Sequence, residues 1–588
     1  MSASDTLPVR FLATVAAHGD IPALTDPFDQ SRHWTYRRFA DDIGRVASGL
    51  AALGVGPGSR VVLMMRNRAE FHLADTAALF LGATPFSVYN TASPEEIAYA
   101  VEHTAASVAV VEDVEYLERF AATRTQAPGL RFVLVDPAAT LPAGVLAWAD
   151  IAGTDPIDLE AAAARAQPDD IATVIFTSGT TGPPKAVAIT HANVCATADA
   201  VVERAGVGSL AGFRMISYLP MAHIAERVVS HYAALLFGTS VTPCNDMLRF
   251  REFTVAVHPN VLFGVPRVWE KLQQGVLAAA SADPARAKAL DDGVNAALDL
   301  VTASRRGPLT TEQQETWDFL DAVAFSVVRE LTGLSDLRLA VTGAAPISPE
   351  LIDWFRALRV PLSEVYGMSE STGVLTWDPV EMKPGTVGRP LGGVDVRLDT
   401  DGEVLARGPN VFPGYLNDAD ATADALQDGW LHTGDIGEID GDGYLRIVDR
   451  KKELIITAGG ENVSPANLEA ALATLPLVGQ ACVVGDRQRF PAAIITLDPE
   501  YAPQWAARNG HEGESLAQLA LEPELHAEIQ RGIDDVNGRF TRAYQIKRFT
   551  VVADEWLPNS DLLTPTFKLK RRGVVDRYGE EIARMYSS

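Results

Sequence analysis

The sequence is poor in cysteine and in basic residues. Only three cysteines, Cys195, Cys244 and Cys482, occur in 588 residues. Their odd number and wide spacing indicate neither a disulfide framework nor a zinc site, and a reducing cytoplasm fits this usage best. Lysine and arginine number 50 against 76 acidic residues, which gives a formal net charge of −26. This balance argues strongly against nucleic acid as a partner, because a phosphate backbone demands a basic face.

Long apolar runs are also missing. No stretch of the sequence approaches the roughly 20 apolar residues that a bilayer-spanning helix needs, and the beginning, MSASDTLPVRFLATVAAHGD, lacks the pattern of a secretory signal. We therefore expect a cytoplasmic protein. Peripheral contact with a membrane stays open at this point, and so does the oligomeric state.

The overall composition, 47% hydrophobic and 21% charged, is that of an ordinary globular protein. The length of the chain suggests three or four structural units. Short apolar runs alternate with helical segments such as 39–53 and 94–103. This alternation predicts an α/β fold with largely parallel sheets. The predicted buried strands are 60–65, 84–89, 107–112, 131–135, 260–265 and 337–342.

The pattern changes twice along the chain. Residues 267–337 are long, Ala-rich and charged, which predicts a helical excursion between two strands. Near residue 400, short β elements with Asp-Gly turns appear, at 385–388, 398–404 and 444–448. The expected fold class is α/β, with a large N-terminal domain (residues 1–450) of mixed and parallel sheets, helices and a β-rich subdomain. A small α+β C-terminal domain (residues 451–588) follows, and its first helix is expected to begin at Ser464-Pro465.

One stretch, TSGTTGPPK (177–185), carries chemistry. It follows the strand-like run 172–176 and combines four hydroxyls, two glycines and a lysine. Backbone N–H groups freed by glycine, hydroxyl donors and a positive charge are what a phosphate needs. The spacing matches neither a Walker A loop nor a dinucleotide fingerprint, so we expect a nucleotide to be held in another way.

Four further motifs follow in a set order: TGAAPIS (342–348), YGMSEST (366–372), WLHTGD (430–435) with DRKKELIITAGGENVSP (449–465), and TPTFKLKRR (564–572). With the first loop, they resemble those of the adenylate-forming (AMP-binding) superfamily, which includes acyl-CoA synthetases, luciferases and peptide-synthetase adenylation domains. The resemblance spans essentially the whole chain. It is closest to long-chain fatty acid–CoA ligases, through LPMAHIAERV (219–228), GVPRVWEKL (264–272) and the helical insert.

The resemblance implies an ATP- and Mg²⁺-dependent ligase that acts on a long- or medium-chain fatty acid. A carboxylate attacks the α-phosphate of ATP to give acyl-AMP and pyrophosphate, and the thiol of coenzyme A then displaces AMP. It also implies an ATP- and AMP-binding set, which is Thr177, Ser178, Gly179, Thr180, Thr181, Gly182, Lys185, Gly343, Ala344, Ala345, Tyr366, Gly367, Met368, Ser369, Asp435, Arg450 and Lys568. Glu370 is the implied metal ligand, with the hydroxyl of Thr177 as a second candidate.

Lys568 matches the family's catalytic lysine and lies in the small domain, so the resemblance implies that domain closure carries it to the α-phosphate. Lys185 and His223 complete the implied catalytic set. Lys452 falls at the implied hinge. Rotation there would exchange Lys568 for the loop of Gly459, Gly460, Glu461 and Asn462 and would open a path for coenzyme A. The neighbours Lys570, Arg571 and Arg572 are expected to contact phosphate or solvent.

Two residues are assigned to the acyl tunnel by the same resemblance, His223 near the carboxylate and Trp269 as an aromatic gate. A structural histidine and a core tryptophan are the alternatives. The chain also departs from the family pattern at Ala186, where glycine is usual, since alanine disfavours a positive φ. Two other functions stay open: a fatty acyl-AMP ligase that loads a carrier protein, and a non-catalytic ATP-binding protein.

Overall fold

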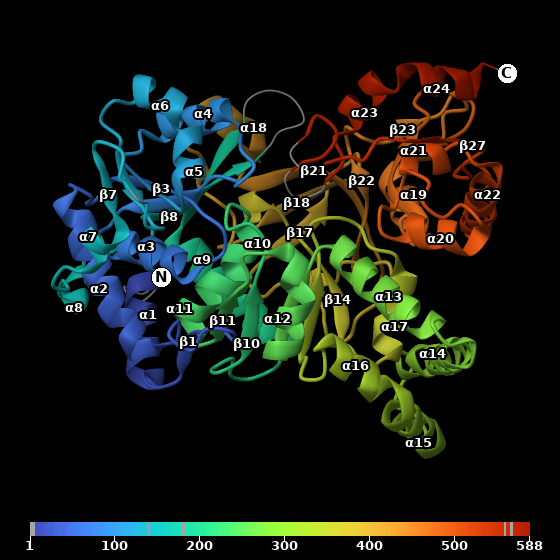
Figure 1. Ribbon diagram of the computed structural model, residues 1–588, viewed down its shortest axis with the longest axis horizontal. Helices are drawn as coiled ribbons and strands as arrows, with labels where there is room; N and C mark the ends of the chain where they lie inside the picture. Colours follow the sequence, from blue (N-terminus) through green and yellow to red (C-terminus); the bar gives the residue numbers. More distant parts are fainter. Residues whose placement is uncertain (1–5, 139, 178–183, 558–559, 565–567, 588) are drawn as a thin grey trace.

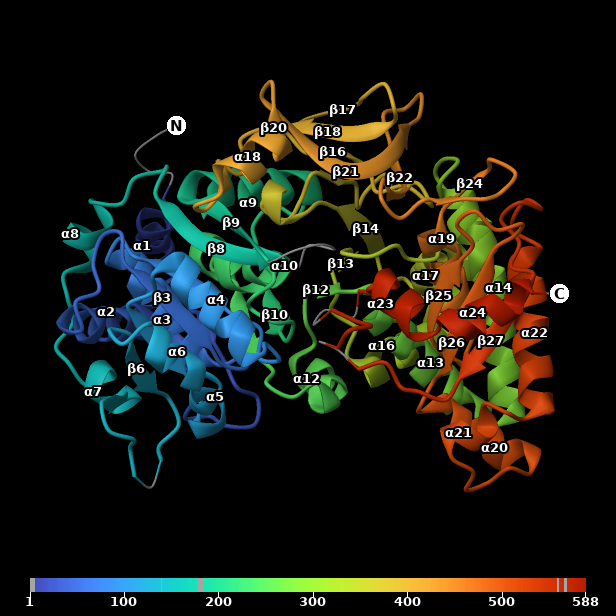
Figure 2. The ribbon, with the colours of Figure 1, turned by 90° about the horizontal axis from the view of Figure 1, so that it is seen from above.

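The structure is a computed structural model that describes residues 6–138, 140–177, 184–557, 560–564 and 568–587. Two α/β regions lie side by side, a β-rich subdomain covers them, and a smaller C-terminal domain lies at one side (Figures 1 and 2). The predicted fold class is therefore confirmed.

The first region is built on an eight-stranded sheet whose central strands are parallel because helices connect them. In spatial order its strands are β19 (Gly414–Tyr415), β9 (Lys185–Thr190), β8 (Ile171–Thr177), β4 (Thr84–Ser87), β3 (Arg60–Met64), β5 (Val108–Val111), β6 (Arg131–Leu134) and β7 (Val145–Ala147). Its helices are α1 (Leu7–His18), α2 (Tyr36–Ala52), α3 (Ala69–Phe80), α4 (Pro94–Thr104), α5 (Val114–Arg119), α6 (Ala121–Gln126), α7 (Trp148–Ala152), α8 (Leu159–Ala163) and α9 (His191–Ala205).

The second region is built on a nine-stranded sheet. In spatial order its strands are β16 (Arg389–Pro390), β15 (Thr376–Trp377), β14 (Leu362–Tyr366), β13 (Leu339–Thr342), β12 (Val261–Gly264), β10 (Arg214–Ser217), β11 (Ser240–Pro243), β1 (Pro22–Leu24) and β2 (Trp34–Thr35). Its helical elements are α10 (Ile224–Glu226), the π-helical turn η1 (Arg227–Tyr232), α11 (Ala233–Phe237), η2 (Met247–Arg249), α12 (Phe250–Val257), α17 (Pro349–Ala357) and η4 (Ser369–Ser371). The six strands predicted from apolar runs are all present, shorter by one or two residues than expected.

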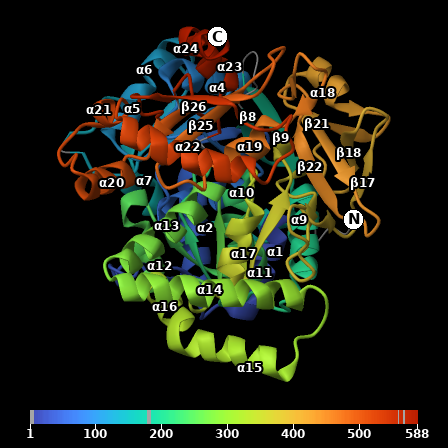
Figure 3. The same ribbon diagram turned by 90° about the vertical axis from the view of Figure 1, so that its right-hand side faces the viewer.

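The predicted helical excursion is also present. It consists of α13 (Pro266–Ser281), α14 (Pro284–Ser304), α15 (Thr311–Leu320), the π-helical turn η3 (Asp321–Phe325) and α16 (Ser326–Thr332). Figure 3 shows α14 and α15 projecting below the rest of the molecule.

Helix α3 joins the two regions and is buried on every side, as a helix between two layers must be. Its Asp75 accepts hydrogen bonds from Arg227 (2.7 Å) and His231 (2.9 Å) of η1, and all three side chains have an exposed fraction of 0%. The other donors of Arg227 bond the carbonyl of Met221 (3.0 Å) and the hydroxyls of Ser87 and Tyr232 (both 3.2 Å). This buried ion pair is therefore fully hydrogen-bonded, which is the condition under which a protein tolerates it.

The β-rich subdomain consists of β17 (Asp395–Leu398), β18 (Glu403–Arg407), α18 (Ala419–Ala425), β20 (Leu426–Gln427), β21 (Trp430–Ile439) and β22 (Leu445–Arg450). Two predictions need correction here. Residues 385–388 form a turn before β16, held by a hydrogen bond from Thr386 to the carbonyl of Lys383. The strand predicted at 444–448 continues to Arg450, because Asp449 and Arg450 pair with β21 in spite of their charge.

The C-terminal domain has its own hydrophobic core. It contains β23 (Ile455–Ile456), β24 (Asn462–Val463), α19 (Pro465–Leu472), β25 (Val478–Val484), β26 (Ala492–Leu497), α20 (Tyr501–Asn509), α21 (Leu516–Leu519), α22 (Pro523–Asn537), β27 (Arg548–Val552), α23 (Arg571–Arg577) and α24 (Gly579–Tyr586). Ser464 caps α19 and Pro465 is its first residue, as predicted.

Ion pairs fix this domain against the helical excursion. Asp498, which follows β26, lies 2.6 Å from a guanidinium nitrogen of Arg267 and 3.2 Å from the ammonium nitrogen of Lys271, both at the start of α13. Lys271 also lies 2.9 Å from Glu500. The side chain of Asp498 has an exposed fraction of 0%, so these contacts are shielded from solvent and hold the two parts in this arrangement.

Candidate functional site

A cavity of about 2480 Å³ lies where the two α/β regions, the β-rich subdomain and the C-terminal domain meet. Most of the site residues expected from the sequence line it, although they come from segments up to several hundred residues apart. They are Thr177, Lys185, His223, Ala344, Ala345, Tyr366, Gly367, Met368, Ser369, Glu370, Asp435, Arg450, Lys452 and Lys568.

The hydroxyl-rich loop enters this cavity from a hairpin. Strands β8 and β9 are antiparallel, and Thr177 pairs with Lys185 where the loop leaves the sheet. Ser178, Gly179, Thr180, Thr181 and Gly182 lie outside the described residues. Ala186 is a buried β9 residue paired with Phe176, and it is not among the described residues of positive φ. The expected conflict at this alanine is therefore absent.

A hydrogen-bonded chain lines the wall next to the loop. The hydroxyl of Tyr366 donates to Asp435 at 2.6 Å, and Arg450 lies 2.9 Å from the other oxygen of the same carboxylate. These hydrogen-bonded side chains come together because Asp435 and Arg450 are paired residues of the neighbouring strands β21 and β22. Burial raises the pKa of Asp435 against the opposing effect of Arg450. Both carboxylate oxygens are thus oriented by neighbours before any ligand arrives.

The backbone of the motifs is strained or crowded at the same wall. Ala344 has φ of +70°, a conformation that non-glycine residues adopt at a cost and that clusters at functional sites. At Gly367 a Cβ atom would lie 2.4 Å from the carbonyl oxygen of Gly373, and at Gly343 it would lie 2.9 Å from that of Val365. Glycine is therefore required where these segments approach each other.

Glu370 has a partner that sequence reasoning missed. The hydroxyl of Tyr415 donates a 2.8 Å hydrogen bond to Glu370, and the ammonium nitrogen of Lys185 lies 4.7 Å from the centre of the Tyr415 ring. Tyr415 is in β19, which pairs with β9 at Val187. One tyrosine thus links the candidate metal ligand to the lysine of the loop.

A second missed residue, Glu364, lies two positions before Tyr366 on β14 and lines the same cavity. Burial raises the pKa of its carboxyl to about 8. The sequence offered one signal: Glu364 is a charged residue within the short strand that leads into the motif YGMSEST.

Lys568 reaches the cavity from the C-terminal domain. The surrounding protein and then the positive charge of Arg450 lower the pKa of its ammonium group to about 8, against the attraction of Asp435 and Glu370. Lys568 in turn opposes protonation of His223. It therefore lies within electrostatic reach of all four of these groups, although it is 345 residues from His223 in the sequence.

A second cavity, of about 1210 Å³, adjoins the first. His223, Val265 and Arg267 line both. Apart from these three, its lining is mostly apolar and comes largely from η2, α12, α13, α14, η3 and α16, for example Phe250, Leu272, Val276, Leu290, Val323, Val327, Val328 and Leu331. The two cavities thus meet at His223. We call the second the apolar chamber, and we call the first the polar chamber after the charged and polar motif residues on its wall, such as Lys185, Glu370, Asp435, Arg450 and Lys568.

The local fold fixes His223 at this junction. It caps α10, where its Nδ1 accepts a hydrogen bond from the backbone of Ala225 at 3.2 Å. Desolvation and then Lys568 lower its pKa to about 3. The imidazole is therefore neutral near pH 7, with Nε2 carrying the proton that it can donate.

Three further predicted parts of the site are a tryptophan, a loop and an arginine. Trp269 has an exposed fraction of 0%, donates to the carbonyl of Gly264 at 3.1 Å and packs edge-to-face on Phe355. It belongs to the core behind the apolar chamber, and it is not among the described residues that line it. The segment Gly459–Asn462 is exposed and lies away from the chambers, in the turn that follows β23 and enters β24 at Asn462. Arg571, expected near phosphate or solvent, instead forms a two-point ion pair with Glu469.

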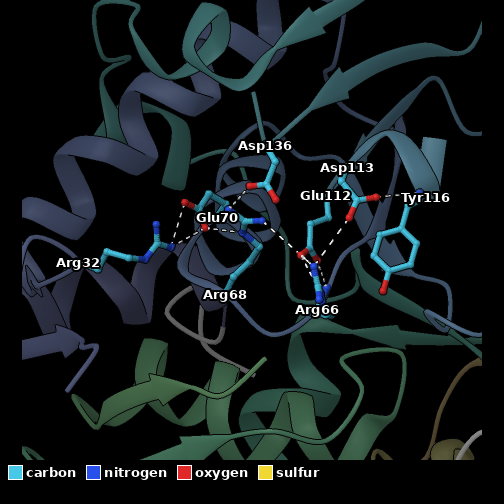
Figure 4. Close-up of polar contacts among 8 residues, drawn as sticks. All are labelled: Arg32, Arg66, Arg68, Glu70, Glu112, Asp113, Tyr116 and Asp136. Carbon is cyan, nitrogen blue, oxygen red and sulfur yellow. Dashed lines mark hydrogen bonds and ion pairs between the residues drawn. The ribbon is translucent and has the colours of Figure 1, made fainter. Parts of the chain in front are cut away.

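A charged cluster lies at the carboxyl ends of β3, β5 and β6, the kind of edge at which ligands of α/β sheets bind. Figure 4 shows its residues. Arg32 and Arg68 both donate to Glu70, and Arg66 donates to Glu112. Burial opposes the ionisation of Glu70, but these hydrogen bonds outweigh it and lower its pKa to about 2. The acidic and basic groups of the cluster pair with one another, so we interpret the cluster as structural.

Comparison with known proteins gives a consistent result. The chain is similar to two Mycobacterium tuberculosis proteins named as fatty-acid–CoA ligases. They are fadD11, at 41% identity over 76% of this chain and 79% of that one, and the long-chain enzyme FadD15, at 35% identity over 93% and 91%. The anthranilate CoA ligase AuaEII in complex with anthranoyl-AMP has the same fold, with a TM-score of 0.74 at 21% identity over 99% of this chain and 100% of that one.

Two family models match, the AMP-binding enzyme at residues 11–416 and the AMP-binding enzyme C-terminal domain at residues 452–588. Together they cover the described walls of the polar chamber except the segment 417–451, which carries Asp435 and Arg450. The chain belongs to the AMP-binding enzyme family.

Proposed function

We propose that this protein is an ATP-dependent fatty acid–CoA ligase. In the first step an acyl carboxylate attacks the α-phosphorus of ATP, the bond to the bridging oxygen breaks, and pyrophosphate leaves. In the second step the thiol of coenzyme A adds to the acyl carbonyl, and AMP leaves as the carbonyl re-forms. The thiol proton is lost to the medium.

The observation that carries this proposal is the meeting of the two chambers at His223. The reaction needs an apolar place for an alkyl chain and a polar place for a nucleotide, with the carboxylate of one beside the phosphate of the other. Because its pKa is about 3, His223 carries no positive charge that would pair tightly with the carboxylate. It can donate one hydrogen bond and orient the nucleophile.

For the nucleotide, we propose the following roles by resemblance to the family. Tyr366 lies against adenine, Gly343, Ala344 and Ala345 line the base, and Asp435 accepts hydrogen bonds from the ribose hydroxyls. The Tyr366–Asp435–Arg450 chain supports this role, since it leaves the carboxylate oriented in advance. The loop 178–182 and Lys185 hold the outer phosphates, and Lys568 neutralises charge at the α-phosphate.

A magnesium ion fits the oxygen donors of this wall. The carboxylate of Glu370 and the hydroxyl of Thr177 line the same chamber, and Mg²⁺ binds through one or two protein oxygens together with substrate phosphates and water. We propose Glu370 as its main protein ligand, supported by the Tyr415 hydroxyl. Bound there, the ion would offset the negative charge of ATP.

For the second half-reaction, we propose a boundary between residues 450 and 451 and a pivot at Lys452. The exposed turn of Gly459, Gly460, Glu461 and Asn462 would then replace Lys568 at the polar chamber and line the path for coenzyme A. The match of one family model from residue 452 onward supports this division. Trp269 is proposed to brace the wall of the apolar chamber from behind rather than to gate it.

The test is a panel of saturated fatty acids of increasing length, scored by pyrophosphate release with and without coenzyme A. We expect release with medium and long chains and acyl-CoA only when coenzyme A is present. Transfer to a carrier protein but not to coenzyme A would instead identify an acyl-AMP ligase. ATP binding without pyrophosphate exchange for any acid would identify a non-catalytic protein.

No helix among the described residues is both long and apolar enough to cross a bilayer. We propose peripheral contact with a membrane. Cytoplasmic location stays a prediction.

A further inference from the structure

Four large apolar side chains lie exposed along one helical face. Phe319, Val323, Val327 and Leu331 recur every fourth residue through α15, η3 and α16, and their exposed fractions are 64%, 57%, 54% and 61%. Residues four apart in a helix lie above one another. Single exposed apolar residues are ordinary, but a continuous row marks a surface that something covers. We call it the apolar row.

The apolar row continues into the apolar chamber. Val323, Val327 and Leu331 line that chamber, and so do Met247 and Leu248 of η2, whose exposed fractions are 51% and 95%. The apolar row and η2 therefore both border the opening of this chamber, which we call the mouth. Helix α12, which follows η2 directly, packs against α16, which carries Val327 and Leu331 of the row (Figure 1).

The near-complete exposure of Leu248 is imposed by a defined turn. Asp246 caps η2 by accepting a hydrogen bond from the backbone of Leu248 at 2.9 Å. The next residue, Arg249, is held over the rings of Phe28 and Phe253, 4.8 Å and 5.3 Å from their centres. The turn is thus anchored on both sides, and it directs a leucine into solvent.

The charge of the residues that line the apolar chamber is opposite to that of the whole chain. The charged residues that line the apolar chamber are Arg66, Arg251, Arg267, Lys271 and Arg286 against one acid, Glu500, although the whole chain carries a net charge of −26. Arg66, Arg267 and Lys271 are engaged by acidic partners. The exposed Arg251 and Arg286 have no ion pair among the described residues. Two uncompensated cations therefore line the chamber near the mouth.

We propose that the apolar row and η2 dock on an anionic lipid bilayer, so that a fatty acid passes from the membrane into the apolar chamber without crossing water. This rests on the proposed function. A bilayer offers apolar chains at the depth that Leu248 and Phe319 would reach, with anionic headgroups at the level of Arg251 and Arg286. A second copy on the same face would place cations against cations, which disfavours that occupant.

Flotation of the full chain with lipid vesicles tests the surface. The wild type should float with phosphatidylcholine vesicles that contain phosphatidylglycerol, less with phosphatidylcholine alone, and less at high salt. Phe319→Asp and Leu248→Asp should each reduce the bound fraction about tenfold, because each places a charge in the apolar boundary. Leu521→Asp, at a leucine of the C-terminal domain that is 80% exposed, is the matched control and should bind normally.

A wild type that fails to float, or variants that float as well as the control, would overturn the proposal. Thermal melting verifies that each variant folds. Sedimentation velocity tests the other occupant: a dimer that Phe319→Asp converts to a monomer, without vesicle binding, would make the face a protein interface and would also overturn it.

An activity assay separates this proposal from the proposed function. Phe319 is not among the described residues that line either chamber. Phe319→Asp should therefore keep wild-type turnover of hexanoate in solution and lose only the faster turnover of palmitate supplied in anionic vesicles. If the wild type activates no acid, the proposed function fails while flotation still reports on the surface. If Phe319→Asp turns over vesicle-borne palmitate normally, the docking proposal fails and the ligase activity stands.

Discussion

The hydroxyl of Tyr415 donates a 2.8 Å hydrogen bond to the carboxylate of Glu370. It does so from β19, the strand that pairs with β9 directly beyond the hydroxyl-rich loop. The arrangement makes Tyr415 a positioning residue for the proposed magnesium ligand.

Tyr415→Phe should raise the Mg²⁺ concentration needed for half-maximal adenylation by about tenfold, because a hydrogen bond to a charged group contributes about 1.5–3 kcal/mol. The phenyl ring keeps its contact with Lys185, so the KM for ATP at saturating Mg²⁺ should change little. Initial rates over a grid of both concentrations measure the split. A uniform loss of rate with unchanged metal dependence would contradict the role.

Lys568→Ala should lower adenylate formation by about 100–1000-fold, the usual effect of removing one electrostatic stabiliser of a transition state. It should leave thioester formation from supplied acyl-AMP intact, because the proposed second state moves Lys568 away. The two half-reactions are measured separately by quenched-flow kinetics. Equal loss of both would point instead to a misfolded C-terminal domain.

The pH profile should report on the same lysine. Since the pKa of Lys568 is lowered to about 8, its charge is present below that pH and is lost as the pH rises through it. The kcat/KM for ATP should fall above pH 8 accordingly. In Lys568→Arg, whose guanidinium stays charged throughout this range, that alkaline fall should disappear even if the rate is lower. An unchanged fall in the arginine variant would assign it to another group.

Lys452→Pro should preserve adenylation and selectively slow transfer to coenzyme A. Proline fixes φ near −65° and restricts the residue before it, so a pivot that needs two backbone conformations retains one. Rapid-quench kinetics of each half-reaction measure the effect. Normal acyl-CoA formation from acyl-AMP would place the pivot at another residue.

Asp75→Asn should destabilise the fold by about 3–5 kcal/mol, because it leaves the buried Arg227 without its counter-charge. Replacement of both partners, as Asp75→Leu with Arg227→Met, should recover much of that loss, since an apolar pair of similar volume avoids the desolvation cost. Urea denaturation followed by circular dichroism provides the unfolding free energies. Equal stability of Asp75→Asn and wild type would mean that Met221, Ser87 and Tyr232 suffice to hold Arg227.

The sequence predicted the fold well because apolar strands and capped helices are local signals. The strands at 60–64 and 108–111 and the cap at Ser464 depend only on neighbouring residues. The prediction ended β22 too early at Val448 because Asp449 is charged. In the fold Asp449 is buried, and it accepts a 2.7 Å hydrogen bond from Ser464, a compensation that only the tertiary structure supplies.

The site was predictable where motif residues act directly, and not where a partner comes from elsewhere. Tyr415 lies 45 residues from Glu370 and in no motif, so nothing local signals their contact. Trp269 illustrates the reverse case. Its place in GVPRVWEKL suggested a tunnel residue, but the rotation of α13 about its axis turns it into the core, and sequence pattern alone does not fix that rotation.

The ion pair between Arg267 and Asp498 has a consequence for the order of events. Arg267 lines both chambers, whereas Asp498 belongs to the domain that carries Lys568. If rotation of that domain removes Asp498, the acidic partner that Arg267 keeps among the described residues is Glu270, 3.2 Å away. Any influence of this change on the acyl group must be reciprocal, because two sites that share one equilibrium bias each other by the same free energy. An occupied acyl chamber would then help to determine which domain arrangement prevails, and the substrate would take part in timing its own transfer.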